Sequence, residues 1–151
     1  MDIKIGQKIR LRGMQESRTV VDYDVFTYTA EVENLDGGNT INDSISIEAD
    51  ATFVATQLSY MCDTGNSQTE STRIVPLVNV AITDTGSGRK LQDTPTDISA
   101  LAGTGQLPRI LDLPRLFQAN STINVQFSNY TAGTNYNHVK LYFQGYKIWF
   151  A

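Results

Sequence analysis

The chain has 151 residues, of which 40% are hydrophobic, so it is most simply one domain with a packed core. Its single cysteine excludes an internal disulfide, and no apolar run approaches the ~20 residues that a membrane-spanning helix needs. The formal net charge of −4 argues against nucleic acid as the main partner. We therefore expect a globular protein that binds neither a membrane nor nucleic acid.

The charges fall into three blocks along the chain. Residues 1–18 hold five basic and two acidic side chains, a net of +3, and residues 19–72 hold ten carboxylates and no basic side chain, a net of −10. Seven basic and four acidic side chains in residues 73–151 give +3, which completes the total of −4. A basic segment beside an acidic one favours contact between the two, within one protomer or between neighbours. A solvated acidic face that only keeps the protein soluble is the alternative.

The first expected element is an extended N-terminal arm over residues 1–14, followed by a single domain over residues 15–151. Apolar and basic side chains alternate in this arm. Its basic members are Lys4, Lys8, Arg10 and Arg12. A segment with so few apolar residues gains little by ordering alone, because fixing each backbone residue costs about 1–2 kcal/mol. We therefore expect the arm to order only on assembly, where it could add a strand to a neighbouring molecule.

Alternation of apolar and polar side chains then predicts a series of strands. A long strand is expected over residues 21–32, where the apolar side chains change from odd to even positions after Val25. Three further strand-like runs cover residues 41–47, 51–61, where the alternation is mixed, and 74–82, and turn-forming clusters lie at residues 36–39, 63–66 and 86–88. Only residues 97–102 look helical, as a single turn that Asp97 would cap and Gly103 would end.

The clearest alternation lies near the C-terminus. Apolar side chains occupy every second position of residues 121–129, which is typical of a half-buried strand in an antiparallel sheet. A loop around Gly133 follows, so we expect the next strand to return beside this one. That strand, over residues 139–150, changes its apolar parity at Gly145, as a β-bulge or a corner between sheets would. Six to eight strands without room for crossover helices predict an all-β antiparallel β-sandwich.

Two motifs in the chain suggest chemistry but are better explained as turns. Asp-Thr-Gly, the signature of aspartic proteases, begins at Asp63 and again at Asp84. The copies are only 21 positions apart, too close for the two lobes of a single-chain protease, and Asp-x-Gly is a common tight-turn sequence. The Gly- and Lys-containing segment over residues 86–90 lacks the spacing of a phosphate-binding loop. We interpret all three segments as turns or loop tips.

No group of residues in the sequence predicts catalysis or ligand binding. His138 is the sole histidine, and no Cys/His cluster or metal-ligand spacing surrounds it. Cys62 has no partnering histidine, so we interpret it as a packed small side chain rather than a nucleophile. The sequence therefore predicts no enzyme, no catalytic residue, no metal and no cofactor.

The strongest candidate for an interface is the segment over residues 107–117, LPRILDLPRLF. A Pro-Arg pair occurs twice in it, six residues apart, and proline favours an extended backbone before it. Extended chain would point Arg109 and Arg115 the same way and leave Ile110 and Leu116, and with them Leu113, available for burial, as in an edge that binds a partner. An edge strand whose prolines only block aggregation is the alternative. Together with the arm, the predicted interface residues are Lys4, Lys8, Arg10, Arg12, Arg109, Ile110, Arg115 and Leu116.

Turn motifs in the second half of the chain follow one another in a characteristic order. A strand ending in a Gly-Ser-Gly turn precedes a Gly-Thr-Gly loop and a Leu-Pro-Arg segment, then a strand opened by Ala-Asn-Ser, and finally Gly-Tyr-Lys. These motifs lie at residues 83–91, 103–105, 113–115, 119–121 and 145–147. This order resembles the jelly-roll decoration (cement) proteins on the heads of tailed bacteriophages. The likeness covers about half of the chain and consists of structural turns, so it transfers no binding residue.

The resemblance implies a jelly roll that binds the outer surface of an assembled phage capsid and stabilises it. Its partners would be the major capsid protein and further copies of itself, as a homodimer or homotrimer. It would be made in the bacterial host cytoplasm and would end on the virion. The alternative is a β-sandwich receptor- or carbohydrate-binding module of a virion or tail, for which Tyr130, Tyr136 and Trp149 are the candidate aromatic side chains.

Overall fold

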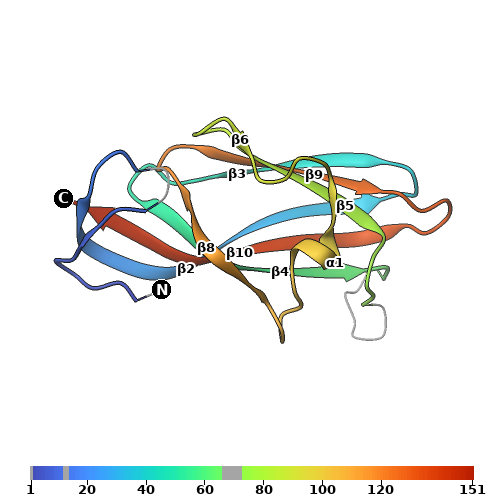
Figure 1. Cartoon of the computed structure of the whole chain (residues 1–151). Coiled ribbons are helices and arrows are strands. Elements are labelled where there is room, and N and C mark those ends of the chain that lie inside the picture. The colour runs from blue at the N-terminus through green and yellow to red at the C-terminus, as the bar shows by residue number, and fades with distance from the viewer. Residues whose placement is uncertain (1, 12–13, 66–72) are drawn as a thin grey trace.

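Two antiparallel sheets face each other in the computed structural model, which describes residues 2–11, 14–65 and 73–151 (Figure 1). The first sheet has the strand order β1-β2-β10-β4-β8 and the second β3-β9-β5-β6, with β7 paired to β5. The elements are β1 (Lys8–Ile9), β2 (Arg18–Leu35), β3 (Thr40–Ser46), β4 (Thr52–Asp63), β5 (Val78–Asp84), β6 (Arg89–Lys90), β7 (Thr96–Asp97), α1 (Ile98–Leu101), β8 (Arg109–Phe117), β9 (Thr122–Asn129) and β10 (Tyr136–Phe150). No helix in the described part of the chain is long and apolar enough to span a membrane.

The strand orders are those of a jelly roll. The chain crosses from one sheet to the other between β2 and β3, β3 and β4, β4 and β5, β7 and β8, β8 and β9, and β9 and β10. The long first strand β2 therefore lies beside the last strand β10, and β3 lies beside β9, as in two interlocked Greek keys. The predicted all-β antiparallel sandwich of the jelly-roll type is confirmed.

Most of the local predictions are confirmed as well. The strands expected over residues 41–47, 51–61, 74–82 and 121–129 correspond to β3, β4, β5 and β9. Asp97 caps the single helical turn, with its Oδ1 accepting a hydrogen bond from Ser99 N at 3.0 Å. Ile74 differs from expectation, because it lies before β5 and is exposed rather than facing the core.

β9 and β10 do not pair with each other, so the expected return of the last strand beside residues 121–129 is wrong. β9 pairs with β3 and β5, whereas β10 pairs with β2 and β4 in the opposite sheet. Stacked sheets lie about 10 Å apart, a distance that the connection over residues 130–135 can span. The buried Asn129 fixes this crossing, because its Nδ2 donates to Leu35 O at 3.0 Å and to Thr134 O at 2.7 Å.

The main core lies between the two sheets. It joins inward-facing side chains from both sheets and is built around fully buried aromatic rings. Phe53 stacks against Phe117 with 6.3 Å between ring centroids, and Phe117 meets Phe143 edge to face at 6.0 Å. These are favourable aromatic geometries, and each buried ring contributes a large apolar area.

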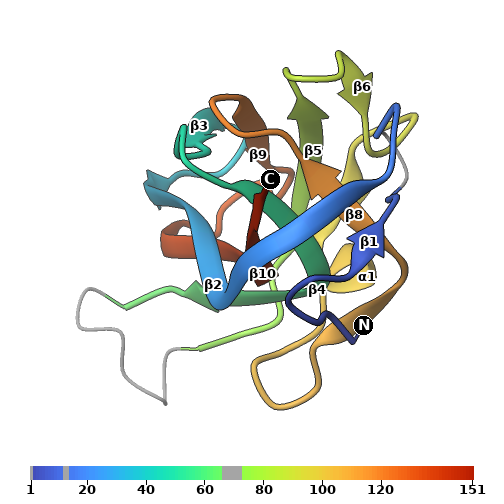
Figure 2. The same cartoon turned by 90° about the vertical axis from the view of Figure 1, so that its left-hand side faces the viewer.

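A second apolar cluster lies on the outer face of the first sheet, beneath the N-terminal segment. Its buried members are Ile3, Val20, Val54 and Ile148, and Ile9, Leu11, Leu116, Tyr146 and Phe150 pack against them. Gly6 N donates to Val20 O at 2.7 Å, and Val20 N donates to Gln7 O at 2.9 Å, so the segment is also bonded to β2. Figure 2 faces this end of the molecule, where both termini lie.

The docked segment differs from the expectation of an arm that orders only on assembly. Ile3, Ile9 and Leu11 contact their own protomer, because this end of the sheet has apolar side chains on its outer face that need a cover. The division of the chain into an arm over residues 1–14 and a domain over residues 15–151 remains a prediction.

The same cover explains the change of parity in β10, whereas Val21, Tyr23 and Val25, the odd-numbered apolar side chains of β2 before Phe26, stay exposed. β2 and β10 keep one register from His138 to Trp149, so neither strand turns over at Val25 or Gly145. Before Gly145 the apolar side chains of β10 face the main core, and after it Tyr146 and Ile148 belong to the cluster beneath the arm. β10 therefore continues without a break, while its buried face changes from the inner to the outer face of the sheet.

A β-bulge does occur at this point, but in β4 rather than in β10. The register of β4 shifts between Ala55 and Gln57, against both β8 and β10. β4 thereby approaches β10 so closely that a Cβ on Gly145 would lie 1.8 Å from Val54 O. Glycine is therefore required at this position by the close approach of two backbones.

Candidate interface surface

β8 forms one edge of the first sheet and is paired only in part. Leu116 and Arg115 lie opposite Val54 and Ala55, and after the register shift Ile110 and Arg109 lie opposite Gln57 and Leu58. The register gives residues 111–114 no partner in β4. Since β8 is the last strand in the sheet order, its outer side offers unpaired backbone groups to a neighbour.

The exposed side of this edge is apolar. Leu107, Ile110 and Leu113, which we call the β8 patch, are 80%, 67% and 63% exposed. Arg109 is exposed beside them, and its Nη1 donates to Ala100 O at 3.0 Å. Three large apolar side chains exposed along one segment make this edge the candidate interface surface.

The structure places the other predicted β8 residues in more enclosed positions. Arg115 is half-buried and lines a small hollow of about 130 Å³ together with Asp84 and Arg89. Leu116 packs against the cluster beneath the arm, so it already has an apolar partner within the chain.

The arm and β8 meet at a larger hollow of about 870 Å³. Lys8 and Leu116, both predicted interface residues, line it together with Arg18 and Phe150. The Arg18 guanidinium lies over the Phe150 ring at 5.0 Å from its centroid, a cation–π contact that holds one basic group at the rim. The sequence pattern did not single out Arg18, because its aromatic partner is 132 positions away.

Lys4 and Arg10 of the arm are exposed. Lys4 Nζ lies 3.9 Å from Asp2 Oδ2 in an exposed pair, a kind that contributes little to stability. The Arg10 Nε donates to Met14 O at 3.4 Å. Arg12 lies outside the described residues.

The opposite edge of the first sheet carries apolar and acidic side chains. β1 pairs with β2 only at Arg18 and Thr19, so the following residues of β2 have β10 on one side and an open edge on the other. The exposed residues here, which we call the β2 patch, are Val21, Asp22, Tyr23, Asp24 and Val25. The two edges of one sheet are therefore both apolar, with arginines on one and aspartates on the other.

The two Asp-Thr-Gly motifs are turns, as predicted. Asp84 Oδ1 accepts from Gly86 N at 3.0 Å and its Oδ2 from Ser87 Oγ at 2.8 Å. Asp63 Oδ1 accepts from Gly65 N in the same way. Through these hydrogen bonds the two carboxylates stabilise the turn that follows each strand.

The position of Cys62 argues against a role as a nucleophile. The side chain is buried in the main core, and burial, reinforced by the charge of Asp63, raises the pKa of its thiol to about 12. The thiolate, which is the reactive species, is therefore scarce at neutral pH.

The aromatic candidates of the alternative function do not form a common platform. Tyr136 is buried and its Oη accepts from Leu77 N at 3.0 Å. The Tyr130 Oη donates to Asp97, and this hydrogen bond raises the pKa of Tyr130 to about 12. Trp149 lies in β10, with its Nε1 donating to Asp50 at 3.3 Å.

Fold and surface together define a jelly-roll β-sandwich with two open, apolar edges, one with Arg109, Asp112 and Arg115 and the other with Asp22 and Asp24. No protein-family model and no curated protein matches the sequence. Among solved structures, the chain is similar to the VP2 subviral particle of infectious bursal disease virus, with a TM-score of 0.35, 14% identity, and 95% of this chain and 38% of that chain covered. It is also similar to the structure of the Gt strain of that virus, with a TM-score of 0.23, 12% identity, and 97% and 48% covered. The chain spans less than half of either, and its jelly-roll class rests on its own strand order.

Proposed function

We propose that this protein is a virion structural protein that binds the outer surface of an assembled tailed-phage capsid and stabilises it, as a decoration (cement) protein. The observation that carries the proposal is the β8 patch, an apolar stretch on an open sheet edge through which copies of the chain could associate on a shell. The order of turn motifs in the second half of the chain also supports it. A surface of this kind suits adhesion to a protein lattice rather than turnover of a substrate.

The physical effect of such a protein follows from linkage. A protein that binds the assembled shell and not the free subunits shifts the assembly equilibrium by mass action. A patch of ~800 Å² per partner is enough for a specific contact. Repetition of that contact around a shell adds avidity.

In this proposal the copies associate through complementary edges of the first sheet. The β8 edge of one protomer, with Arg109 and Arg115, pairs with the β2 edge of the next, with Asp22 and Asp24. Unpaired backbone groups on both edges supply hydrogen bonds, and the opposite charges set the orientation. Such a contact is heterologous, and it closes into a ring when its rotation allows, which favours a homotrimer over a homodimer.

The capsid contact is assigned to the arm. Lys4, Lys8 and Arg10 are exposed on the same end of the molecule, and Lys8 lies at the rim of the larger hollow. An acidic patch of the major capsid protein would complement them. Because these groups are exposed, the contact should weaken as the salt concentration rises.

Charge reversal at the two edges tests the self-association. Arg109→Glu with Arg115→Glu, or Asp22→Lys with Asp24→Lys, should give monomers by light scattering, while all four changes in one chain should restore the oligomer. Lys90→Glu, an exposed charge reversal on β6, serves as the control and should leave the oligomer intact. Oligomers that persist in both double variants would contradict the edge contact.

Co-sedimentation with shells that lack the protein tests the capsid contact separately. Lys4→Glu, Lys8→Glu and Arg10→Glu together should abolish sedimentation with shells while leaving the oligomeric state unchanged. Wild-type protein that fails to sediment with shells, or to raise their melting temperature, would overturn the proposed function.

A further inference from the structure

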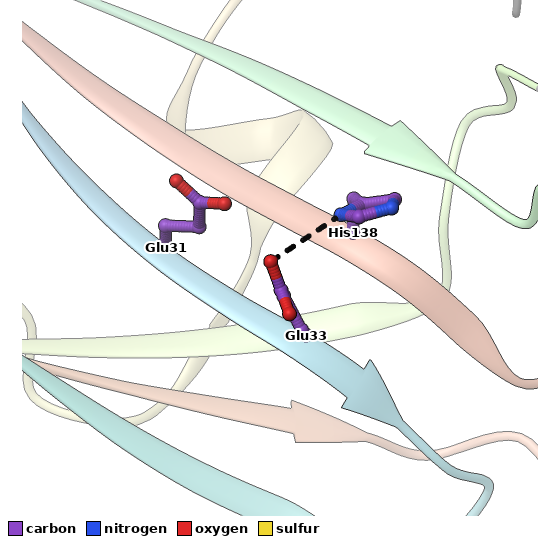
Figure 3. Close-up of side chains that lie close together, drawn as sticks. All are labelled: Glu31, Glu33 and His138. Atoms are coloured by element: carbon purple, nitrogen blue, oxygen red, sulfur yellow. Dashed lines mark ion pairs between the residues drawn. The ribbon is translucent and has the colours of Figure 1, made fainter. Parts of the chain in front are cut away.

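Three metal-ligating side chains lie together on the outer face of the first sheet, at the end remote from the arm (Figure 3). Glu31 and Glu33 belong to β2 and His138 to β10, and the strand register places Glu33 directly opposite His138. One carboxylate oxygen of each glutamate and one imidazole nitrogen all lie within 4.8 Å of one another.

One nitrogen of the His138 imidazole has no hydrogen-bond partner. Nδ1 of His138 is buried and has no hydrogen-bond partner, although the side chain as a whole is 13% exposed. The nearest carboxylate oxygen, Glu33 Oε1, lies 4.0 Å from it, which is too far for a hydrogen bond. A buried polar atom without a partner costs free energy, so this arrangement favours an additional bound group.

The spacing fits a shared ion. Two ligands that each lie about 2.0–2.1 Å from a zinc ion are about 3.3 Å apart in a tetrahedral site. A small rotation of the exposed Glu33 side chain closes the 4.0 Å gap to that value, and Glu31 needs a somewhat larger rotation. Both glutamate side chains are exposed, so these movements do not disturb the core.

The ligand atoms of these three side chains indicate which metal ion they would bind. One imidazole with two carboxylates is a mixed nitrogen and oxygen set, which suits Zn²⁺ and other divalent first-row transition metals, whereas Ca²⁺ and Mg²⁺ prefer oxygen alone. Three protein ligands leave a position for water. We propose that Glu31, Glu33 and His138 form a zinc-binding site that ties the edge strand β2 to the central strand β10.

Lys140 competes with a metal ion for the Glu31 carboxylate. Its Nζ lies 4.0 Å from Glu31 Oε2, and the register places Lys140 opposite Glu31. Without a metal, the four side chains therefore form two cross-strand pairs, Glu33 with His138 and Glu31 with Lys140. Zinc binding must draw Glu31 away from Lys140, so removal of the lysine charge should strengthen it.

Calorimetric titration of the whole chain with zinc chloride tests the proposal. The expected result is one ion per chain. His138→Gln or Glu33→Gln should lower the zinc affinity about tenfold or more, because loss of a residue that only hydrogen-bonds to a metal ligand already lowers affinity by that factor. Lys140→Met should raise the affinity, and magnesium chloride should give no binding. Because the chain has one histidine and its one cysteine is buried, few other strong zinc ligands compete.

A second measurement on the wild-type protein does not depend on the folding of any variant. The sole histidine gives one set of imidazole resonances in NMR spectra, and zinc should move them while leaving resonances of the arm in place. Zinc without effect on these resonances, or an affinity that His138→Gln leaves unchanged, would overturn the site. The site stands independently of the proposed capsid binding, because neither measurement involves a shell.

Discussion

The two apolar clusters of this molecule use opposite faces of the same sheet, and they differ in how they are covered. The main core is enclosed by a second sheet, and its strands alternate regularly. The cluster beneath the arm is enclosed by a single segment that carries Ile3, Ile9 and Leu11. A sheet face covered by another sheet is held from many directions, whereas a face covered by one segment depends on a few side chains. The two clusters should therefore contribute very differently to stability.

The largest effect is expected in the main core. Phe143→Ala removes a fully buried ring that packs against Phe117, and large-to-small changes of this kind cost about 3–5 kcal/mol of unfolding free energy. Urea denaturation should show one transition that moves to lower denaturant. A loss below about 1 kcal/mol would mean that the main core is looser than its burial implies.

A smaller and more local effect is expected beneath the arm. Ile3→Ala should cost about 2 kcal/mol, the lower end for a buried isoleucine, because the arm is able to detach while the sandwich stays folded. Ile5→Ala is the matched control, since Ile5 is exposed and should tolerate the change. Hydrogen exchange of the Gly6 and Val20 amides reports the detachment directly. Equal losses in the two variants would contradict the buried role of Ile3.

A still smaller effect is expected beside Phe26 and Tyr28 of the main core, where Lys147 is buried. Burial opposes its charged form, but the hydrogen bond to Glu48 and the nearby Tyr28, Glu48 and Asp50 outweigh that effect and raise the pKa of Lys147. The ammonium also lies 4.1 Å from the centroid of the Phe26 ring. Because the folded pKa exceeds the unfolded one, this stabilisation is fully present below the unfolded pKa of about 10.4 and is lost as pH rises through the folded value.

Glu48→Gln tests the contribution of this ion pair. It should cost about 1 kcal/mol at pH 7, less than the ~1.5–3 kcal/mol of a typical charged hydrogen bond, because Glu48 is largely exposed. The difference from wild type should vanish in urea titrations at a pH above the folded pKa of Lys147. A difference that stays constant into that range would mean that the charge of Lys147 is not its cause.

The smallest effect concerns reactivity rather than stability. Cys62 belongs to the main core, and its raised pKa keeps the thiol protonated, so a thiol reagent at pH 8 should modify it only when that core opens. Phe143→Ala should accelerate modification, whereas Ile3→Ala should not. Acceleration by both would show that the two clusters open together.

Sequence reasoning succeeded where structure is set by neighbours along the chain. Alternation located β9, Asp97 marked the start of α1, and Asp63 and Asp84 form the expected turns. A turn signal alone does not state whether the chain returns beside its own strand or crosses to the facing sheet. For this reason the partners of β10 were misassigned.

The features that were missed depend on residues far apart in sequence. Ile3 meets Ile148 only because β10 lies in the middle of the first sheet, and the exposed Val21 and Val25 belong to the edge that this arrangement leaves open. His138 had no ligand neighbours along the chain, whereas the register sets it beside Glu33, 105 positions earlier. Alternation identifies which side chains share a face but not what lies across from them.

The central position of β10 also bears on how the protein folds. β10 is the latest strand along the chain, yet it lies between β2 and β4, and its contact with β2 joins residues at opposite ends of the sequence. During synthesis β2 and β4 must therefore wait for β10 before the first sheet can close. Folds dominated by such distant pairings fold in milliseconds to seconds rather than microseconds. The edges of the first sheet consequently take their final form only after nearly all of this sequence has been synthesised.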